Sequence, residues 1–114
     1  MAAWMFASLL GAARPLVVVH GGAGSNRKAM KPWTDEAAAG ALKELTEGRS
    51  ALEAAMAGTV ILEDNPRFNA GTGSNIRMDG HTIQMDAAVM DGATGGFGAV
   101  AAIERVKNPV RVAR

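Results

Sequence analysis

The stretch from Leu62 to Gly92 constrains the fold of this chain more than any other. A helix-forming run stops at Asn65-Pro66, because a proline ring disfavours helical geometry in the residue before it and lacks a backbone N–H. The loop that follows is rich in residues that tolerate a positive φ, namely Asn69, Gly71 and Gly73. Asp79-Gly80 then has the composition preferred in the two-residue turn of a β-hairpin. The stretch predicts a helix, a tight loop and two strands in close succession.

The composition is that of an ordinary globular domain. The 114 residues are 48% hydrophobic and 20% charged, with a formal net charge of +1. Twelve basic and eleven acidic residues give no strong field to attract nucleic acid or an anionic membrane, so neither is a predicted partner. Without cysteine the chain has no disulfide framework and no thiolate chemistry, and its histidines are not clustered as a zinc site requires.

Residues 1–15 are interpreted as a loose N-terminal extension. Their apolar run, residues 2–10, has no basic residue before it, as a secretory signal requires, and is too short to span a membrane. A signal peptide is the alternative interpretation. We therefore expect a cytoplasmic protein, or a periplasmic or secreted one if this segment acts as a signal.

Leu16–Val19 is continuously apolar and mostly β-branched, which predicts a strand buried on both faces. Residues 20–24 end it with three glycines, which favours a sharp exit from a crowded strand. A nucleotide-binding loop would need a further glycine at position 27, which is Arg27. His20 is interpreted as a packed residue at the strand end.

Two helices are predicted next. The first has Thr34 as its N-cap, acids in its first turn and an end at Gly48. The second runs from about Ala51 to Asp64, because residues 50–53 (Ser-Ala-Leu-Glu) form a capping box. Small residues in the second helix, Gly58 among them, predict that another element packs closely against it.

The second half of the chain predicts β structure, beginning near Ser74. A strand from Thr82 to Met90 and another from Phe97 to Ile103 are apolar on both faces, so both faces of the sheet should be covered. Asn108-Pro109 then predicts the start of a further helix, with the proline at its first position. The fold class is α/β of the α+β type, a mostly antiparallel sheet with helices on one face. The predicted helices cover about one face, which suggests an incomplete domain.

Several motifs, in the same order, resemble the plant-type asparaginases, also called isoaspartyl peptidases. They are residues 20–24 (HGGAG), 64–73 (DNPRFNAGTG), 85–92 (MDAAVMDG), 98–101 (GAVA) and 108–110 (NPV). The resemblance covers residues 16–114 and implies the N-terminal portion of the α subunit, ending before the nucleophile. It implies an αββα sandwich made as a precursor that cuts itself into α and β subunits, of which this chain would be an incomplete part.

The resemblance also implies the chemistry. The family's nucleophile is the threonine that begins the β subunit, and it attacks L-asparagine or β-aspartyl (isoaspartyl) dipeptides with its own α-amino group as the base. No catalytic residue of that kind is matched in this chain, and no catalytic cofactor is implied. The implied partners are the missing C-terminal part of the α subunit, the β subunit, a second αβ unit in a dimer, and a small-molecule substrate.

Asn69 matches a loop asparagine that lies near the nucleophile in the family, and Gly21 and Gly22 match a loop beside the catalytic centre. These three are the predicted supports of the active site. The alternative for Asn69 is a turn asparagine with left-handed backbone geometry. Asp86 and Asp91 lie five residues apart with opposite side-chain directions on a strand, so they are predicted to be structural rather than a general-acid pair.

The family's loop also encloses a monovalent cation, usually sodium, through backbone carbonyls. The match implies that the carbonyl donors are Leu62, Glu63, Asn65, Phe68, Ala70 and Thr72. Carbonyl oxygens suit a hard cation, and the glycines permit the curvature that aims them inward. The alternative is an ordinary loop that binds no ion.

The leading hypothesis is a fragment of a threonine-dependent amidohydrolase that is inactive by itself. Gly58-Thr59-Val60 imitates the family's cleavage motif, but Thr59 is predicted to lie inside a helix, where its amide cannot become a free base. A glycosylasparaginase-like amidase fragment is the nearest enzyme alternative. The alternative from another class is a noncatalytic interaction fragment that needs a partner to cover its sheet.

Overall fold

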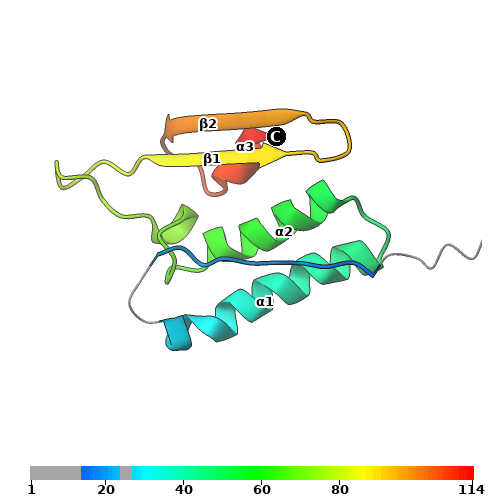
Figure 1. Ribbon diagram of the computed structural model, residues 1–114. Coiled ribbons are helices and arrows are strands. Elements are labelled where there is room, and N and C mark those ends of the chain that lie inside the picture. Colours follow the sequence, from blue (N-terminus) through cyan, green and yellow to red (C-terminus); the bar gives the residue numbers. More distant parts are fainter. Residues whose placement is uncertain (1–13, 24–26) are drawn as a thin grey trace, which may run out of the picture.

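The computed structural model describes residues 14–23 and 27–114, and this part of the chain is an α+β fold (Figure 1). The sheet is a two-stranded antiparallel one, and helices lie on one of its faces, as the sequence predicts. The elements in chain order are α1 (Arg27–Thr46), α2 (Ala51–Asp64), the short 3₁₀ helix η1 (Gly71–Gly73), β1 (Met85–Met90), β2 (Phe97–Ile103) and α3 (Pro109–Ala113). Helix α3 contacts both strands, α2 lies beneath them, and α1 pairs with α2. The predicted extension falls outside the described residues except for Arg14 and Pro15.

Helix α2 begins and ends where the sequence predicts. The Ser50 hydroxyl accepts a hydrogen bond from Glu53 N at 3.2 Å, and the Glu53 carboxylate accepts one from Ser50 N at 2.9 Å. This capping box satisfies two N–H groups that the helix cannot pair internally. At the other end Asn65 is extended, with φ −90° and ψ 115°, as the following proline requires.

Helix α1 begins earlier than predicted. It starts at Arg27 and includes Pro32, and Thr34 is not its N-cap. Instead, the Thr34 hydroxyl donates to the carbonyl of Lys31, a local bond that is available inside a helix. Proline fixes φ near the helical value, so Pro32 is compatible with the helical backbone although it contributes no N–H. The prediction took Thr34 and the acids after it as a helix start, whereas these residues lie in the helix interior.

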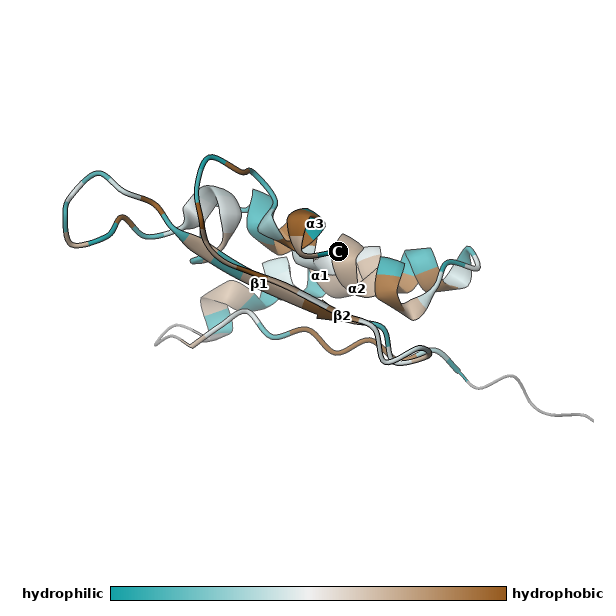
Figure 2. Cartoon of the chain, turned by 90° about the horizontal axis from the view of Figure 1, so that it is seen from above, coloured by the Kyte–Doolittle hydropathy of each residue, from teal (hydrophilic) through white to brown (hydrophobic). Residues whose placement is uncertain are grey.

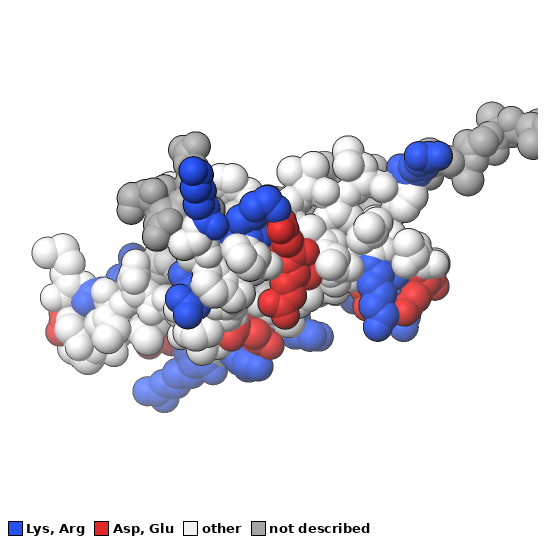
Figure 3. Space-filling view, turned by 90° about the horizontal axis from the view of Figure 1, so that it is seen from below, with Lys and Arg blue, Asp and Glu red and all other residues white. Residues whose placement is uncertain are grey.

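Small residues let α1 and α2 approach closely, as predicted. A methyl group at Gly58 would lie 3.2 Å from both the carbonyl oxygen of Ala37 and the Cβ of Ala41. Ala37 and Ala41 lie against Gly58 and are buried, and Ala54 of α2 is buried as well. The outer surface of the helix pair mixes lysines and arginines with acids (Figure 3). Ion pairs join Lys43 to Glu47 and Arg49 to Glu44.

Strands β1 and β2 form the sheet, with Ala88 opposite Ala99 and Met90 opposite Phe97. The β2 bounds agree with the prediction, but β1 begins at Met85 rather than Thr82. The turn at Asp79-Gly80 is present, with φ +79° at the glycine and a hydrogen bond from Arg77 N to Thr82 O at 2.8 Å. Its flanks are not regular strands, so the strand predicted before the turn is wrong. Two paired segments with no further strand beside them in the described ranges are marginal as a sheet.

The covered face of the sheet carries Met85, which is buried, and Val89, which is half-buried. Helix α3 packs on this face, and it begins at Pro109 as predicted. A methyl group at Gly98 would collide with the carbonyl of Ala113 in α3. The opposite face is open, with Met90 63% and Phe97 70% exposed. Figure 2 shows apolar and neutral colours along both strands. Coverage of both faces, which the sequence predicts, is therefore not found within the described structure.

Residues 16–19 do not form the predicted strand. The segment is extended and runs past α1 and α2 (Figure 1), but it has no hydrogen-bonded strand neighbour in the described structure. Leu16 and Val18 are 83% and 84% exposed rather than buried. A strand is defined by its ladder, and an apolar run cannot form one without a neighbour. None of the helices in the described ranges combines the length and apolar character needed to cross a bilayer.

Candidate active-site cavity

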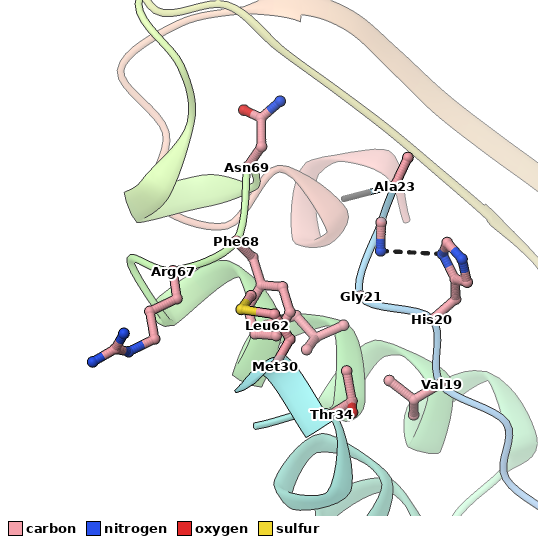
Figure 4. Close-up of a pocket in the computed structure, with 11 residues that line it drawn as sticks. Val19, His20, Gly21, Ala23, Met30, Thr34, Leu62, Arg67, Phe68 and Asn69 are labelled. Atoms are coloured by element: carbon pink, nitrogen blue, oxygen red, sulfur yellow. Dashed lines mark hydrogen bonds between the residues drawn. The ribbon is translucent and has the colours of Figure 1, made fainter. Parts of the chain in front are cut away.

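A cavity of 960 Å³ lies where the N-terminal segment meets the two long helices and the loop after α2 (Figure 4). Three parts of the chain form its wall: the segment around His20, the first half of α1, and the end of α2 with its loop. The lining residues are Val19, His20, Gly21, Gly22, Ala23, Met30, Thr34, Leu62, Arg67, Phe68 and Asn69. The three predicted support residues therefore border one cavity.

Gly21 is the point of closest approach between these parts. A methyl group at this position would lie 2.7 Å from the ring of Phe68 and 2.9 Å from Cγ2 of Thr34. Phe68 itself is buried, at 4% exposure. Any larger side chain at position 21 would separate the N-terminal segment from the loop that carries Asn69. Gly21 thus has a steric requirement for glycine.

Gly22 has a different requirement. Its φ is +90°, which favours glycine, and nothing lies within 4 Å of the position that a Cβ would occupy. Its N–H donates to Nδ1 of His20 at 3.1 Å (Figure 4). His20 is exposed, so the interpretation of this histidine as a packed strand-end residue is wrong. The extended segment before it has no strand neighbour to pack the ring against.

Asn69 lies at the cavity rim, and in Figure 4 its side chain points away from Phe68 and Gly21. Its Oδ1 accepts a hydrogen bond from Asn75 N at 2.9 Å, which holds the residues after η1. Asn69 is not among the residues with a positive φ, so the left-handed alternative is wrong. Nδ2 has no partner among the described residues. The side chain therefore has a donor that the fold does not use.

Sequence reasoning missed the contact between Arg67 and Trp33. The guanidinium carbon of Arg67 lies 4.2 Å from the centroid of the Trp33 ring, a cation–π arrangement that joins the loop to α1. No local pattern could reveal it, because the two residues belong to different elements. In Figure 4 the Arg67 side chain extends outward from the cavity.

The loop from Leu62 to Thr72 is closed by its own backbone. The carbonyls of Leu62, Asn65 and Ala70 accept hydrogen bonds from Asn65, Phe68 and Gly73 respectively, at 3.1–3.3 Å. Gly71, at φ +51°, lies against the carbonyl of Glu63, and Gly73 lies against the carbonyls of Phe68 and Pro66. A Cβ at either glycine would fill the space beside these oxygens. Since a carbonyl oxygen has two lone pairs, the three bonded ones keep capacity for a cation.

Glu63 has a role that its sequence position did not reveal. Its side chain is buried, at 3% exposure, and Oε1 accepts a hydrogen bond from Val110 N at 3.0 Å. Burial raises the pKa of the Glu63 carboxyl, while the Val110 N–H and the Asn108 amide act in the opposite direction. Oε2 is buried without a partner among the described residues. The bond joins residues 47 positions apart, which is why no local pattern could indicate it.

Asp86 and Asp91 are structural, as predicted. Asp86 accepts a hydrogen bond from Ala102 N at 2.7 Å, across the irregularity between β1 and β2. Asp91 accepts bonds from Ala93 N at 3.0 Å and from the Thr94 hydroxyl at 2.8 Å in the turn between the strands. These two bonds lower the pKa of Asp91, with the Thr94 hydroxyl as the larger cause.

Thr59 lies inside α2, as predicted, and its hydroxyl donates to the carbonyl of Ala55 at 2.9 Å. Thr72 lies in η1. Groups of three or more histidine or acidic side chains that could hold a metal ion do not occur in the described ranges.

Comparison with known proteins identifies relatives. The sequence pattern of the asparaginase family matches residues 13–114. The plant-type L-asparaginase of Pyrococcus abyssi is 50% identical over an alignment 103 residues long, which covers 86% of this chain and 33% of that protein. The isoaspartyl peptidase/L-asparaginase of Danio rerio is 45% identical over 108 residues (88% and 33%), and that of Nostoc sp. is 40% identical over 111 residues (89% and 33%).

The chain thus spans about a third of the length of these curated relatives. The motifs around Gly21 and Asn69, which the fold brings to one cavity, both lie within the matched region. A match that covers this much of the chain is sufficient to assign it, and the chain belongs to the asparaginase family.

Proposed function

We propose that this chain is the N-terminal portion of the α subunit of a threonine-dependent amidohydrolase acting on L-asparagine and β-aspartyl dipeptides. Relatives named plant-type L-asparaginase and isoaspartyl peptidase/L-asparaginase support the substrate class. The observation that carries the proposal is that Gly21 and Asn69, from two motifs shared with the family, border one cavity. We expect the protein in the cytoplasm unless residues 1–15 act as a signal.

The reaction class follows from an N-terminal threonine outside this chain. Its hydroxyl attacks the side-chain amide carbon of the substrate, and its own α-amino group, with an ordinary pKa of about 7.7–8.0, accepts the proton. Ammonia or an amine leaves, and water then releases aspartate from the acyl-enzyme. Donors that stabilise the oxyanion come from the β subunit in this proposal.

The contribution of this chain is to shape one wall of the site. Gly21 keeps the N-terminal segment against Phe68, and the Asn69 Nδ2 donor is available for the reacting centre. Thr59 is unsuitable as the nucleophile, because its amide lies inside α2 and its hydroxyl is bonded to Ala55. The chain alone is therefore proposed to be inactive.

The same proposal includes a structural sodium ion, held by the backbone carbonyls of Leu62, Glu63, Asn65, Phe68, Ala70 and Thr72. What supports it is the donor chemistry: neutral oxygens, spare lone pairs on the bonded carbonyls, and glycines that leave space beside Glu63 O and Phe68 O. The ion would stabilise the loop and take no part in the reaction.

The test begins with the purified chain. Incubation with L-asparagine and with a β-aspartyl dipeptide should release ammonia and aspartate only at the uncatalysed rate, and the intact mass should not change. The completed protein, which is this chain extended through the rest of its reading frame, should cut itself before a threonine and hydrolyse both substrates. A completed protein that is folded but neither cleaves itself nor hydrolyses them would refute the proposal. Activity of the short chain that disappears in Thr59→Ala would refute its inactivity.

An interaction fragment is the second candidate, favoured by the open sheet face with Met90 and Phe97 exposed. A folded partner on that face would exclude water from it whether the chain is part of an amidohydrolase or an interaction fragment. The two candidates differ in the reading frame after Arg114. A downstream Gly-Thr-Val-Gly segment supports the amidohydrolase, and a frame without any such threonine supports the interaction fragment. A glycosylasparaginase-like specificity is tested by adding a glycosylated asparagine to the substrate panel.

A further inference from the structure

Helix α3 begins without a cap from its own N-cap residue. Asn108 occupies that position, but its side chain donates to Oδ1 of Asp64 at 2.9 Å and makes no capping bond. The first turn is satisfied from another element instead, since the Glu63 carboxylate accepts from Val110 N at 3.0 Å. An acceptor with negative charge is favourable at this end of a helix. A side chain of α2 therefore performs the role of the α3 cap.

Glu63 also contacts the loop that borders the cavity. Its Cβ lies 2.7 Å from the position a Cβ would take at Gly71, and its carbonyl oxygen is closer still. Gly71 follows Asn69 by two residues, and Asn69 holds the amide of Asn75. One residue thus contacts α3 through its carboxylate and the cavity loop through its backbone and Cβ.

We propose that Glu63 is a positioning residue that couples the cavity loop, residues 67–75, to α3 and hence to the sheet. A displacement of either partner changes the position of the other through this residue, whose backbone and Cβ lie beside Gly71 and whose carboxylate holds Val110 N. Burial makes the coupling strong, because water cannot replace the acceptor when Val110 N loses it. Beside the buried bond, Lys107 Nζ lies 3.0 Å from Asp64 Oδ1, an exposed ion pair between the end of α2 and the segment just before α3.

The experiment measures amide hydrogen exchange at Val110 and Asn75 in the chain and in its variants. Glu63→Ala should raise exchange at both amides, by about tenfold or more at Val110, since a buried N–H loses its acceptor. Glu63→Gln retains an acceptor oxygen and should restore exchange close to that of the original chain. Glu53→Ala is the matched control, because Glu53 caps the opposite end of the same helix and should affect neither amide.

Two results would overturn the coupling. One is an increase in amide hydrogen exchange at Val110 in Glu63→Ala without any change in exchange at Asn75. The other is Glu63→Gln behaving like Glu63→Ala, which would show that the acceptor is not what holds α3. No arm of the experiment measures hydrolysis, so its failure leaves the proposed amidohydrolase function untouched.

A second pair of variants serves if Glu63→Ala does not fold. Gly71 and Gly80 both have positive φ, +51° and +79°, but only Gly71 has Glu63 beside the position of a Cβ, and nothing lies within 4 Å of that position at Gly80. Gly71→Ala should therefore raise exchange at Val110, far along the chain, whereas Gly80→Ala should not. Equal effects of the two variants, or no effect of Gly71→Ala, would refute the proposal.

Discussion

Asn69 has an acceptor and a donor in one side chain, and the fold uses the acceptor. Asn69→Asp keeps an oxygen for Asn75 N but removes the Nδ2 donor. In the completed protein we expect kcat to fall about a hundredfold with little change in thermal midpoint, as for the loss of one donor at a reacting centre. The control is Asn75→Ala, which keeps the backbone amide that Asn69 binds. Full activity in Asn69→Asp would show that Asn69 is only a loop residue.

The pKa of Asp91 provides a test of the hydrogen bonds in the turn between β1 and β2. Its pKa lies below the ordinary value of 3.8, because the Thr94 hydroxyl and the Ala93 N–H favour the charged form. A depressed pKa means that the turn is stabilised above pH 3.8 and loses this stabilisation as pH falls through the lower value of the folded state. The pH dependence of the Ala93 amide chemical shift should therefore have its midpoint below 3.8. In Thr94→Val the midpoint should rise, and a midpoint unchanged by that substitution would contradict the assignment.

At the scale of elements, the contact between β2 and α3 depends on Gly98 having no side chain. Gly98→Ala would push a methyl group into the carbonyl of Ala113, so α3 must move off the sheet. Overpacking of this kind costs about 1–3 kcal/mol. We expect a lower urea midpoint for Gly98→Ala and no such loss for Gly92→Ala, since nothing lies within 4 Å of a Cβ at Gly92. Equal midpoints for the two variants would show that α3 docks loosely.

The loop after α2 provides the test of the sodium ion. A ligand that binds the folded state alone raises its stability by mass action. The thermal midpoint of the completed protein should therefore be higher in sodium than in a large organic cation at equal ionic strength. Removing the carboxylate in Glu53→Gln, outside the loop, should leave that difference intact. If the two salts give the same midpoint, the loop is held by its own hydrogen bonds.

Local patterns predicted the elements whose ends are determined by their own residues. Helix α2 follows its capping box and its proline stop, β2 follows its apolar run, and α3 begins at Asn108-Pro109. Predictions failed where a neighbour decides the outcome. Leu16–Val19 has strand character but no described neighbour to pair with, and α1 extends past an apparent cap at Thr34.

In the candidate site, too, features of a single segment differ from contacts between elements in how far the sequence could predict them. Gly21 has a steric need for glycine and Gly22 a backbone need, but the crowded strand whose exit they were predicted to form is not present in the described structure. The cap from Glu63 to α3 and the contact of Arg67 with Trp33 could not be predicted, because their partners lie in other elements. Contacts between different elements have no fixed separation along the chain, so a single sequence contains no pattern that indicates them.

At the scale of the whole molecule, the open sheet face determines behaviour in solution. Met90 and Phe97 are opposite one another on this face and both are exposed, and Leu16 and Val18 add exposed apolar surface elsewhere. Such surface associates when no partner covers it. We expect the isolated chain to sediment as concentration-dependent oligomers.

The test of that expectation replaces the exposed apolar pair on the open sheet face with a pair of opposite charges. Met90→Glu with Phe97→Lys places opposite charges across the strands, which preserves pairing while removing the apolar surface. This double variant should sediment as a smaller species, whereas Leu42→Glu on α1 should not change the distribution. A monomeric original chain with a sharp, concentration-independent unfolding transition would contradict the expectation.

The bond from Glu63 to Val110 also has a consequence for the order of folding. The α1–α2 pair and the β1–β2 hairpin each close over a short connection, so each can form from contiguous sequence. The bond that brings α3 to α2 closes 47 residues, which costs about 3 kcal/mol of chain entropy beyond a constant. A helix of five residues has no stability of its own to offset that cost. Two local hairpins therefore form early, and the later docking of α3 onto α2 joins them to one another.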